Sequence, residues 1–250
     1  MGDPTESTPL TGESDKPPPV DLLRRLQGVS AIASHVWGMV ALGFTVWFFE
    51  QHKGTQKVFN THYLLMVIGY CIVTMGALSF KYYTCMSRFM RKAFHVICFS
   101  TMIVLGGLGI WFAVRQHNEQ LHAHLVSFHS WVGAITVVFF STQWVFGVFA
   151  FALPTNLSAE FKGKAVKVHK YVGRFLYQII CVTMLIGLQE HQPFKDCNYH
   201  ITKPQLDPWT NMWRIPSDCK TGIVMGFSIL SMCVCTIFAI EEFNTERKKE

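Results

Sequence analysis

The stretch Val126-Ser-Phe-His-Ser-Trp-Val-Gly133 opens a long apolar run and places a histidine, His129, near its start. Forty residues later, Val168-His-Lys-Tyr-Val-Gly173 repeats the pattern, again with a glycine four positions after the histidine. Residues four apart lie on the same face of a helix. The repeat therefore predicts two helices that each carry a histidine beside a glycine in an apolar environment.

The rest of the chain is equally apolar. Half of its 250 residues are hydrophobic and 15% are charged, against about a quarter charged in soluble domains. Apolar runs near the ~20 residues that cross a bilayer predict an all-α, six-helix integral membrane bundle over residues 28–242. The six spans are expected at 29–49, 61–80, 93–114, 126–153, 169–189 and 221–241.

The ends of the chain have a different composition. Residues 1–27 are rich in proline, serine and threonine and contain no apolar run, so they are expected to form a disordered cytosolic tail and not a signal peptide. Residues 243–250 are expected to form a second cytosolic tail. The first span then acts as the signal for membrane insertion.

The distribution of lysine and arginine predicts the orientation. The two tails and the connections 81–92 and 154–170 carry 14 of the 22 basic residues, whereas the connections on the other side carry 7. Because basic residues collect on the cytosolic side of a membrane protein, both termini are expected in the cytosol. This bias also accounts for most of the formal net charge of +6, and no basic stripe indicates nucleic-acid binding. The predicted surroundings are the lipid bilayer.

A 31-residue non-cytosolic connection, 190–220, joins the last two spans and contains Cys197 and Cys219. A disulfide between them would persist on that side of the membrane, and the sequence leaves open both this bond and the role of the connection.

Four of the eleven histidines occupy similar positions, near the starts of the second to fifth spans. Alternate spans run in opposite directions, so His62 and His129 are expected at one height near the non-cytosolic face. His95 and His169 are expected at one height near the cytosolic face. A bilayer core of ~30 Å places the two heights ~20 Å apart, so each pair must act by itself.

Paired imidazoles in an apolar bundle indicate a metal cofactor. Imidazole is a good ligand for iron, copper and zinc, but no further cysteine or carboxylate ligand lies at the same depth on these spans. Two opposed imidazoles leave four equatorial positions, which a porphyrin fills, and bis-histidine haem is suited to electron transfer. No Cys-x-x-Cys-His motif is present, so two non-covalent haem b groups are predicted. Gly133, Gly173 and Gly69 are expected to leave room for the rings.

An alternative function is a histidine-lined metal transporter or channel, in which the same residues form transient sites. It requires polar residues that join the two heights, and the spans offer few. A non-catalytic scaffold leaves the matched histidines unexplained.

Several segments in this order resemble the cytochrome b561 family, most closely its D-type, tumour-suppressor-like branch. The segments are Ala33-Ser-His-Val-Trp-Gly-Met-Val-Ala-Leu-Gly-Phe44, Phe59-Asn-Thr-His-Tyr-Leu-Leu-Met-Val-Ile-Gly69, Lys92-Ala-Phe-His95, His124-Leu-Val-Ser-Phe-His-Ser-Trp-Val-Gly-Ala134 and Gln143-Trp-Val-Phe-Gly147. The resemblance covers roughly residues 25–190. It implies that His62, His95, His129 and His169 ligate haem iron, and that cytosolic ascorbate passes electrons across the membrane to monodehydroascorbate or a ferric chelate on the non-cytosolic side.

The resemblance also implies substrate-binding residues. Lys92 matches a basic position associated with cytosolic ascorbate, and His117 matches a histidine near the non-cytosolic substrate site. Lys81 and Arg91 belong to the same basic rim as Lys92, which would concentrate the ascorbate anion, although the orientation bias alone would also place these charges there. No general base or nucleophile is predicted. The sequence leaves open a homodimer and the membrane of residence, either an endomembrane (endoplasmic reticulum or vesicle) or the plasma membrane.

Overall fold

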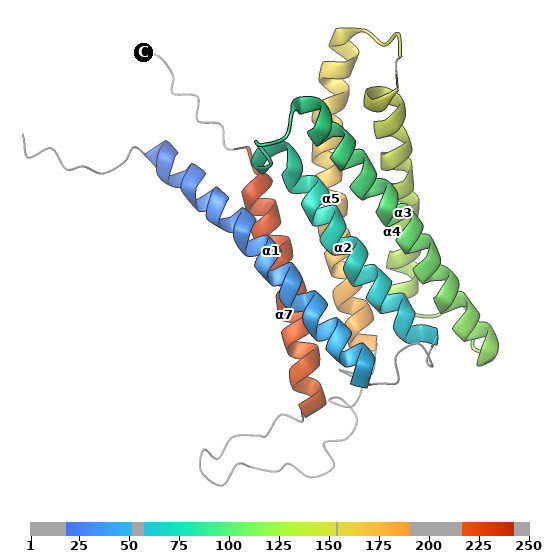
Figure 1. Ribbon diagram of the computed structural model, residues 1–250. Coiled ribbons are helices and arrows are strands. Elements are labelled where there is room, and N and C mark those ends of the chain that lie inside the picture. The colour runs from blue at the N-terminus through green and yellow to red at the C-terminus, as the bar shows by residue number, and fades with distance from the viewer. Residues whose placement is uncertain (1–18, 52–57, 154, 191–216, 243–250) are drawn as a thin grey trace, which may run out of the picture.

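The computed structural model describes residues 19–51, 58–153, 155–190 and 217–242. These residues form an all-α bundle of long helices (Figure 1). The helices are α1 (Pro19–Gln51), α2 (Val58–Tyr82), α3 (Arg88–Glu119), α4 (Phe128–Gly147), α5 (Ala159–Glu190) and α7 (Ser217–Ile240). A π-helical turn, η2 (Val148–Ala152), continues α4. Helices satisfy all backbone hydrogen bonds within one segment, which is what a bilayer requires.

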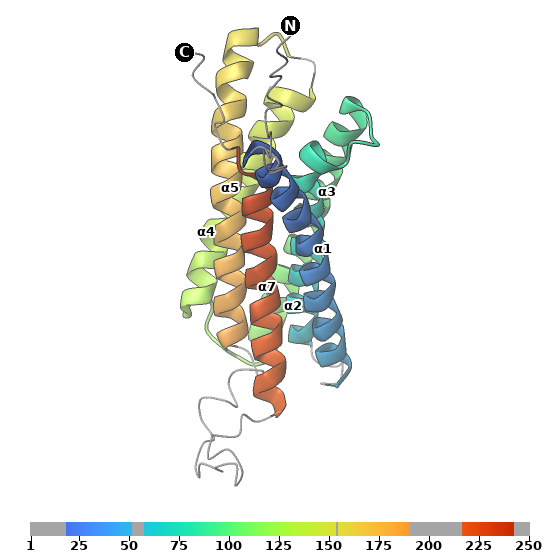
Figure 2. The same ribbon diagram turned by 90° about the vertical axis from the view of Figure 1, so that its left-hand side faces the viewer.

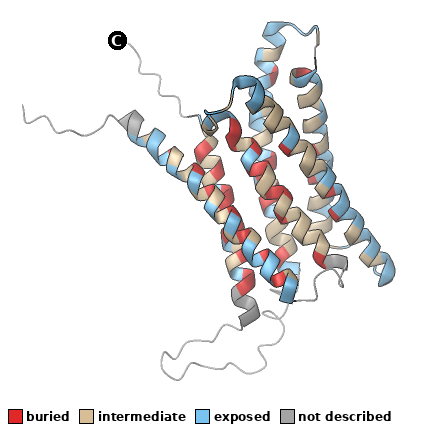
Figure 3. Cartoon of the chain, in the orientation of Figure 1, coloured by how far each residue is buried: buried red, intermediate tan, exposed pale blue. Residues whose placement is uncertain are grey.

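The six long helices each contain a segment that is long and apolar enough to cross a membrane. Their outward faces carry large hydrophobic side chains, for example Met39, Ile97, Phe139 and Phe175. Figure 3 shows exposed positions along the outer faces of the bundle and buried positions where the helices meet. This pattern, apolar both inside and outside, confirms the predicted six-helix membrane protein.

The helices are arranged as two hairpins and a covering pair. Helix α2 packs along α3, α4 packs along α5, and α1 packs along α7 on one side of both hairpins (Figures 1 and 2). The two hairpins meet largely through aromatic side chains. Tyr70 stacks on Tyr177 with ring centroids 4.9 Å apart, and Phe99 stacks on Phe140 at 5.7 Å. The histidines of the second to fifth spans therefore all lie in the two facing hairpins.

A cluster of hydrogen bonds attaches the last turn of α7 to three other helices. The Lys81 ammonium donates to the carbonyl oxygens of Ala239 and Glu241 and to the side chain of Gln27. Arg174 pairs with the Glu241 carboxylate at 3.1 Å and donates to the Ile240 carbonyl oxygen. Cations are favourable at a helix C-terminus because its carbonyl groups have no partner within the helix. These contacts fix one end of α7 against α1, α2 and α5.

The helices extend further than the apolar spans. Helix α1 begins at Pro19, so the prediction of a disordered tail up to residue 27 is wrong for residues 19–27, and Gln27 is buried against α7. Helix α5 begins at Ala159, and its first three turns carry Lys162, Lys164 and Lys167. His169 is therefore well inside its helix and not near its start. An apolar run marks only the part of a helix that faces lipid, whereas these extensions are polar.

Candidate functional site

The structure brings the four histidines together as two pairs. The first pair is His62 on α2 and His129 on α4, whose ring centroids are 6.1 Å apart. The second pair is His95 on α3 and His169 on α5, at 6.4 Å. Two imidazoles that ligate one metal ion from opposite sides at about 2 Å place their centroids roughly 6 Å apart. The pairing predicted from height is confirmed, and each pair has the spacing of two ligands on one iron.

The Nδ1 atom of every one of these imidazoles already has a partner on the other helix of its own hairpin. His62 Nδ1 lies 2.9 Å from the Gly109 carbonyl oxygen, and His95 Nδ1 lies 3.0 Å from that of Gly76. His129 Nδ1 lies 2.9 Å from the Thr183 carbonyl oxygen. A carbonyl partner holds the proton on Nδ1 and directs Nε2 toward a metal. Three of the four histidines thus have the hydrogen-bond arrangement that is typical of a metal-ligating imidazole.

His169 differs from the other three. Its Nδ1 lies 2.8 Å from Nε2 of the Gln143 side chain, and the same amide nitrogen donates to the His169 carbonyl oxygen at 2.8 Å. Here a side-chain amide stands where the other histidines meet a backbone carbonyl group.

Glycines on the facing helix make room for the imidazoles. A Cβ atom at Gly187 would lie 2.6 Å from His129 Cε1, and one at Gly147 would lie 2.9 Å from His169 Cε1. Either distance is shorter than ordinary contacts of a Cβ atom, so a side chain at these positions would force the imidazole to move. Each ring of the α4–α5 hairpin therefore rests on the bare backbone of its neighbour.

A cavity of about 620 Å³ surrounds the first pair. Its wall is largely apolar, and His62, His129 and Gly133 line it. His117 and His124 also line the cavity, with their rings 5.5 Å apart, and so does Glu190. The Glu190 carboxylate accepts from the His129 backbone N–H at 3.3 Å, at the N-terminus of α4, where a negative charge is favourable. The size is that of a cofactor pocket.

The residues at the two pairs fit a haem better than a bare metal ion. Among the residues that the structure describes, no three histidine, cysteine, aspartate or glutamate side chains are grouped to hold a metal. Two paired imidazoles in an apolar setting would instead suit an iron whose remaining positions a porphyrin fills.

Comparison with known proteins agrees with this geometry. The sequence profile described as eukaryotic cytochrome b561 matches residues 61–195, more than half of the chain, including all four histidines. The chain belongs to the cytochrome b561 family.

Three relatives show how far the similarity extends. A "probable ascorbate-specific transmembrane electron transporter 2" of Oryza sativa subsp. japonica is 36% identical over 55% of this chain and 58% of its own length. The "ascorbate-specific transmembrane electron transporter 1" of Zea mays is 30% identical over 65% of this chain and 72% of its own. A "lysosomal membrane ascorbate-dependent ferrireductase" of Mus musculus is 29% identical over 79% and 83%. The match to the rice protein thus spans less than two thirds of it.

The predicted substrate residues of this cytochrome b561 lie at both ends of the bundle. Lys92 is partly buried one turn before His95 on α3, and Arg91 donates to the Phe80 carbonyl oxygen at 2.8 Å. Lys81 has the three acceptors described above, two at the end of α7 and Gln27 on α1. His117 shares the cavity of the first pair. The structure places these residues near the expected pairs, and their binding of substrate stays a prediction.

Two features of the site were missed by sequence reasoning. The hydrogen-bond partners Gly76, Gly109, Gln143 and Thr183 were not predicted, although each lies fourteen residues after the histidine of its own helix. The expected role of the glycines is also different. Gly133 does line the cavity, but a Cβ atom at Gly173 would meet only Gln143 Nε2, at 3.8 Å, and Gly69 packs on Met102. The glycines in contact with the rings belong to the facing helices.

Proposed function

We propose that this cytochrome b561 is an ascorbate-dependent transmembrane oxidoreductase that holds two non-covalent haem b groups. The observation that carries the proposal is that the four imidazoles form two pairs, with ring centroids 6.1 and 6.4 Å apart. Each of the four Nδ1 atoms has a hydrogen-bond partner on the other helix of its hairpin. His62 and His129 would ligate one haem, and His95 and His169 the other. A bis-histidine haem supplies a one-electron couple with no open coordination position.

The proposed direction of transfer rests on the basic residues. Lys92, Arg91 and the lysines of the α5 extension lie at the end of the bundle that holds the second pair. The excess of lysine and arginine at this end assigns it to the cytosol. The positive charge there would attract the ascorbate anion. Ascorbate would lose one electron and one proton there and leave as monodehydroascorbate. Lys81 is placed to hold α7 as well as to add to this field.

The acceptor site is proposed at the other end. His117 lies at the cavity of the first pair, within reach of a substrate that approaches from the non-cytosolic side. A ferric chelate would gain one electron there and become ferrous, or monodehydroascorbate would be reduced to ascorbate. The names of the maize and mouse relatives, which refer to ascorbate-specific electron transport and to ascorbate-dependent ferric reduction, support this reaction.

The test uses the purified full-length protein in liposomes. It should contain about two haems per chain with low-spin b-type spectra, and ascorbate added on one side should reduce ferricyanide enclosed on the other. His129→Leu should remove one haem and stop transfer to the enclosed acceptor, while the remaining haem stays reducible by ascorbate. A protein without haem would overturn the proposal.

The predictions about the disulfide, the oligomeric state and the membrane of residence are unchanged. Cys197 lies outside the residues that the structure describes, so its disulfide with Cys219 stays a prediction, as do the homodimer and the endomembrane or plasma-membrane location. The 190–220 connection is shorter than expected at one end, because α7 begins at Ser217.

A further inference from the structure

The four helices of the two hairpins follow one spacing rule. On each helix, the residue fourteen positions after the histidine contacts the histidine of the partner helix. At Gly76, Gly109 and Thr183 this contact is made by the backbone carbonyl oxygen. At residue 143 the side chain of glutamine makes it instead. Three of the four imidazoles therefore have a backbone partner that no substitution removes, whereas the partner of His169 is a side chain that substitution can change.

A backbone carbonyl and a glutamine amide affect an imidazole differently. A helix carbonyl is held in place and can only accept, so it draws the Nδ1 proton and makes the imidazole a stronger electron donor to iron. The Gln143 amide has a donor and an acceptor end. In the structure the amide nitrogen faces Nδ1 and also donates to the His169 carbonyl oxygen. An imidazole that ligates iron through Nε2 carries its proton on Nδ1, so the amide must turn to present its oxygen as the acceptor, and it then gives up the bond to the His169 carbonyl oxygen. The pull on the His169 proton is consequently weaker.

The surroundings hold the Gln143 side chain at this place. The neighbouring Trp144 donates its indole N–H to Ser100 on α3 at 3.1 Å, which anchors α4 beside the second pair. Gly173, one turn after His169 on α5, leaves space in which the amide lies. One turn further along α4, Gly147 brings the backbone against the His169 ring. Gln143 is therefore positioned by its own contacts with α5, on a helix that Trp144 anchors to α3.

We propose that Gln143 is a positioning residue that sets the reduction potential of the haem held by His95 and His169, and that it makes this potential higher than a fourth backbone carbonyl would. A weaker acceptor on Nδ1 makes His169 a poorer donor and favours ferrous over ferric iron. The haem of the other pair, whose two histidines both meet carbonyl groups, is not affected. This inference rests on the proposed function.

Two substitutions with opposite expected effects test it. Gln143→Leu keeps the volume but removes the acceptor, and the potential of the second-pair haem should rise. Gln143→Glu supplies a stronger acceptor of the same length, and the potential should fall. Each shift should be about tenfold in the ferrous-to-ferric ratio at a fixed applied potential, or about 59 mV for a one-electron couple. The first-pair haem should titrate as in the unsubstituted protein.

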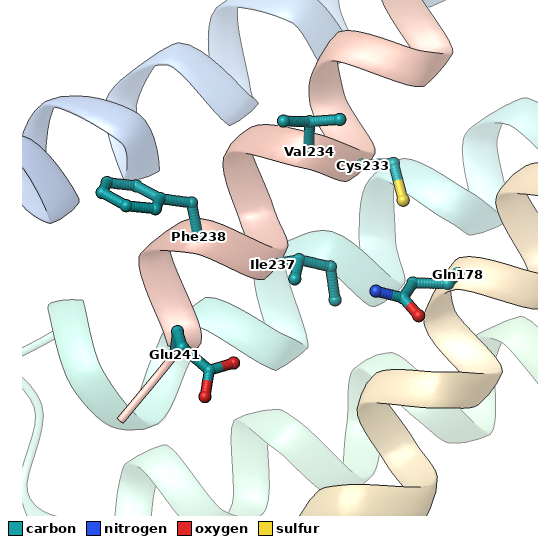
Figure 4. Close-up of a pocket in the computed structure, with 6 residues that line it drawn as sticks. All are labelled: Gln178, Cys233, Val234, Ile237, Phe238 and Glu241. Carbon is teal, nitrogen blue, oxygen red and sulfur yellow. The ribbon is translucent and has the colours of Figure 1, made fainter. Parts of the chain in front are cut away.

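Gln178→Leu is the matched control. Gln178 lies on the same helix as His169, but its amide is directed toward a groove between α5 and α7 that is lined by Cys233, Val234 and Ile237 (Figure 4). Loss of this amide should leave both potentials unchanged. The readout is a spectroscopic redox titration of the purified full-length proteins, which separates the two haems by potential.

The outcomes are distinct. Shifts of the same sign in the Leu and Glu variants, or shifts of both haems together, would mean that Gln143 has only a structural role and would overturn the inference. If the Leu variant loads a single haem, the Glu variant decides: an unchanged potential refutes the inference. Failure of the proposed function would appear earlier, as an unsubstituted protein without two haems.

Discussion

Replacement of Gly187 by alanine should remove the haem of the first pair while leaving the helix bundle folded. The added Cβ atom would lie 2.6 Å from His129 Cε1 and 2.9 Å from its Nδ1. Carbon atoms in contact are ~3.5–4.0 Å apart, so the ring must move by roughly 1 Å. A metal site tolerates displacements of ~0.2 Å. The movement is several times that limit, and it also breaks the bond from His129 Nδ1 to the Thr183 carbonyl oxygen.

The fold should survive because the obstacle is the end of a side chain and not the backbone. Alanine is favoured over glycine within a helix by ~0.5–1 kcal/mol, whereas overpacking of a rigid core costs ~1–3 kcal/mol, and the imidazole can turn away. We therefore expect helix content like that of the unsubstituted protein and about one haem per chain. The measurement is the ratio of haem to protein, with circular dichroism for the fold.

Two further glycines provide a graded comparison. Gly147→Ala brings its Cβ to 2.9 Å from His169 Cε1, a smaller overlap that should weaken haem binding at the second pair without abolishing it. Gly107→Ala meets no heavy atom within 4 Å and should keep both haems. Full haem content with an unchanged spectrum in Gly187→Ala would refute the view that this bare backbone is required for ligation.

Three other predictions concern charge, pH and buried hydrogen bonds. Lys92→Met should raise the KM for ascorbate about two- to five-fold without loss of haem, as expected for one partly exposed charge worth ~0.5–1 kcal/mol; an equal effect at high salt would contradict it. The hydrogen bond from Lys170 lowers the pKa of Glu242 below its usual 4.5, so its small stabilising effect is complete above pH 4.5 and is lost as the pH falls through the lowered pKa. Glu242→Gln should remove that part of the pH dependence of the unfolding midpoint, and identical profiles would disprove it. Tyr177→Phe removes a buried hydroxyl 2.6 Å from Thr74 Oγ1 and should lower the unfolding free energy by ~0.6–1.7 kcal/mol with both haems retained; unchanged stability would show that this bond contributes nothing.

The architecture and the pairing of the histidines could be predicted from the sequence because both depend on position along the membrane normal. An apolar run fixes where a helix crosses, and alternation of direction then fixes the height of His62, His95, His129 and His169. This prediction does not require knowing which helices are adjacent. The two close ring distances follow once the hairpins face each other.

The remaining parts of the site depend on which helices are adjacent, and the apolar pattern does not contain that information. The partners of the Nδ1 atoms are mostly backbone carbonyl groups, which every residue has. Gly187 contacts a ring on α4, so its role cannot be seen from its own helix. The acceptors of Lys81 at Ala239 and Glu241 come from a distant part of the chain, so the sequence did not predict this structural contact, and the role of Lys81 in substrate binding stays a prediction.

On each of the four helices, fourteen residues separate the histidine from the residue that contacts the histidine of the other helix, so all four helices set the same distance. At 1.5 Å per residue this interval measures about 21 Å, so the two levels of histidine pairs are held at a fixed separation by the helices themselves. One inserted residue would turn the far end of that helix by about 100° and withdraw its contact. The π-helical turn at Val148–Ala152 begins only after the interval in α4 has ended. An irregular helix is tolerated there because it lies beyond the length that separates the two histidine pairs.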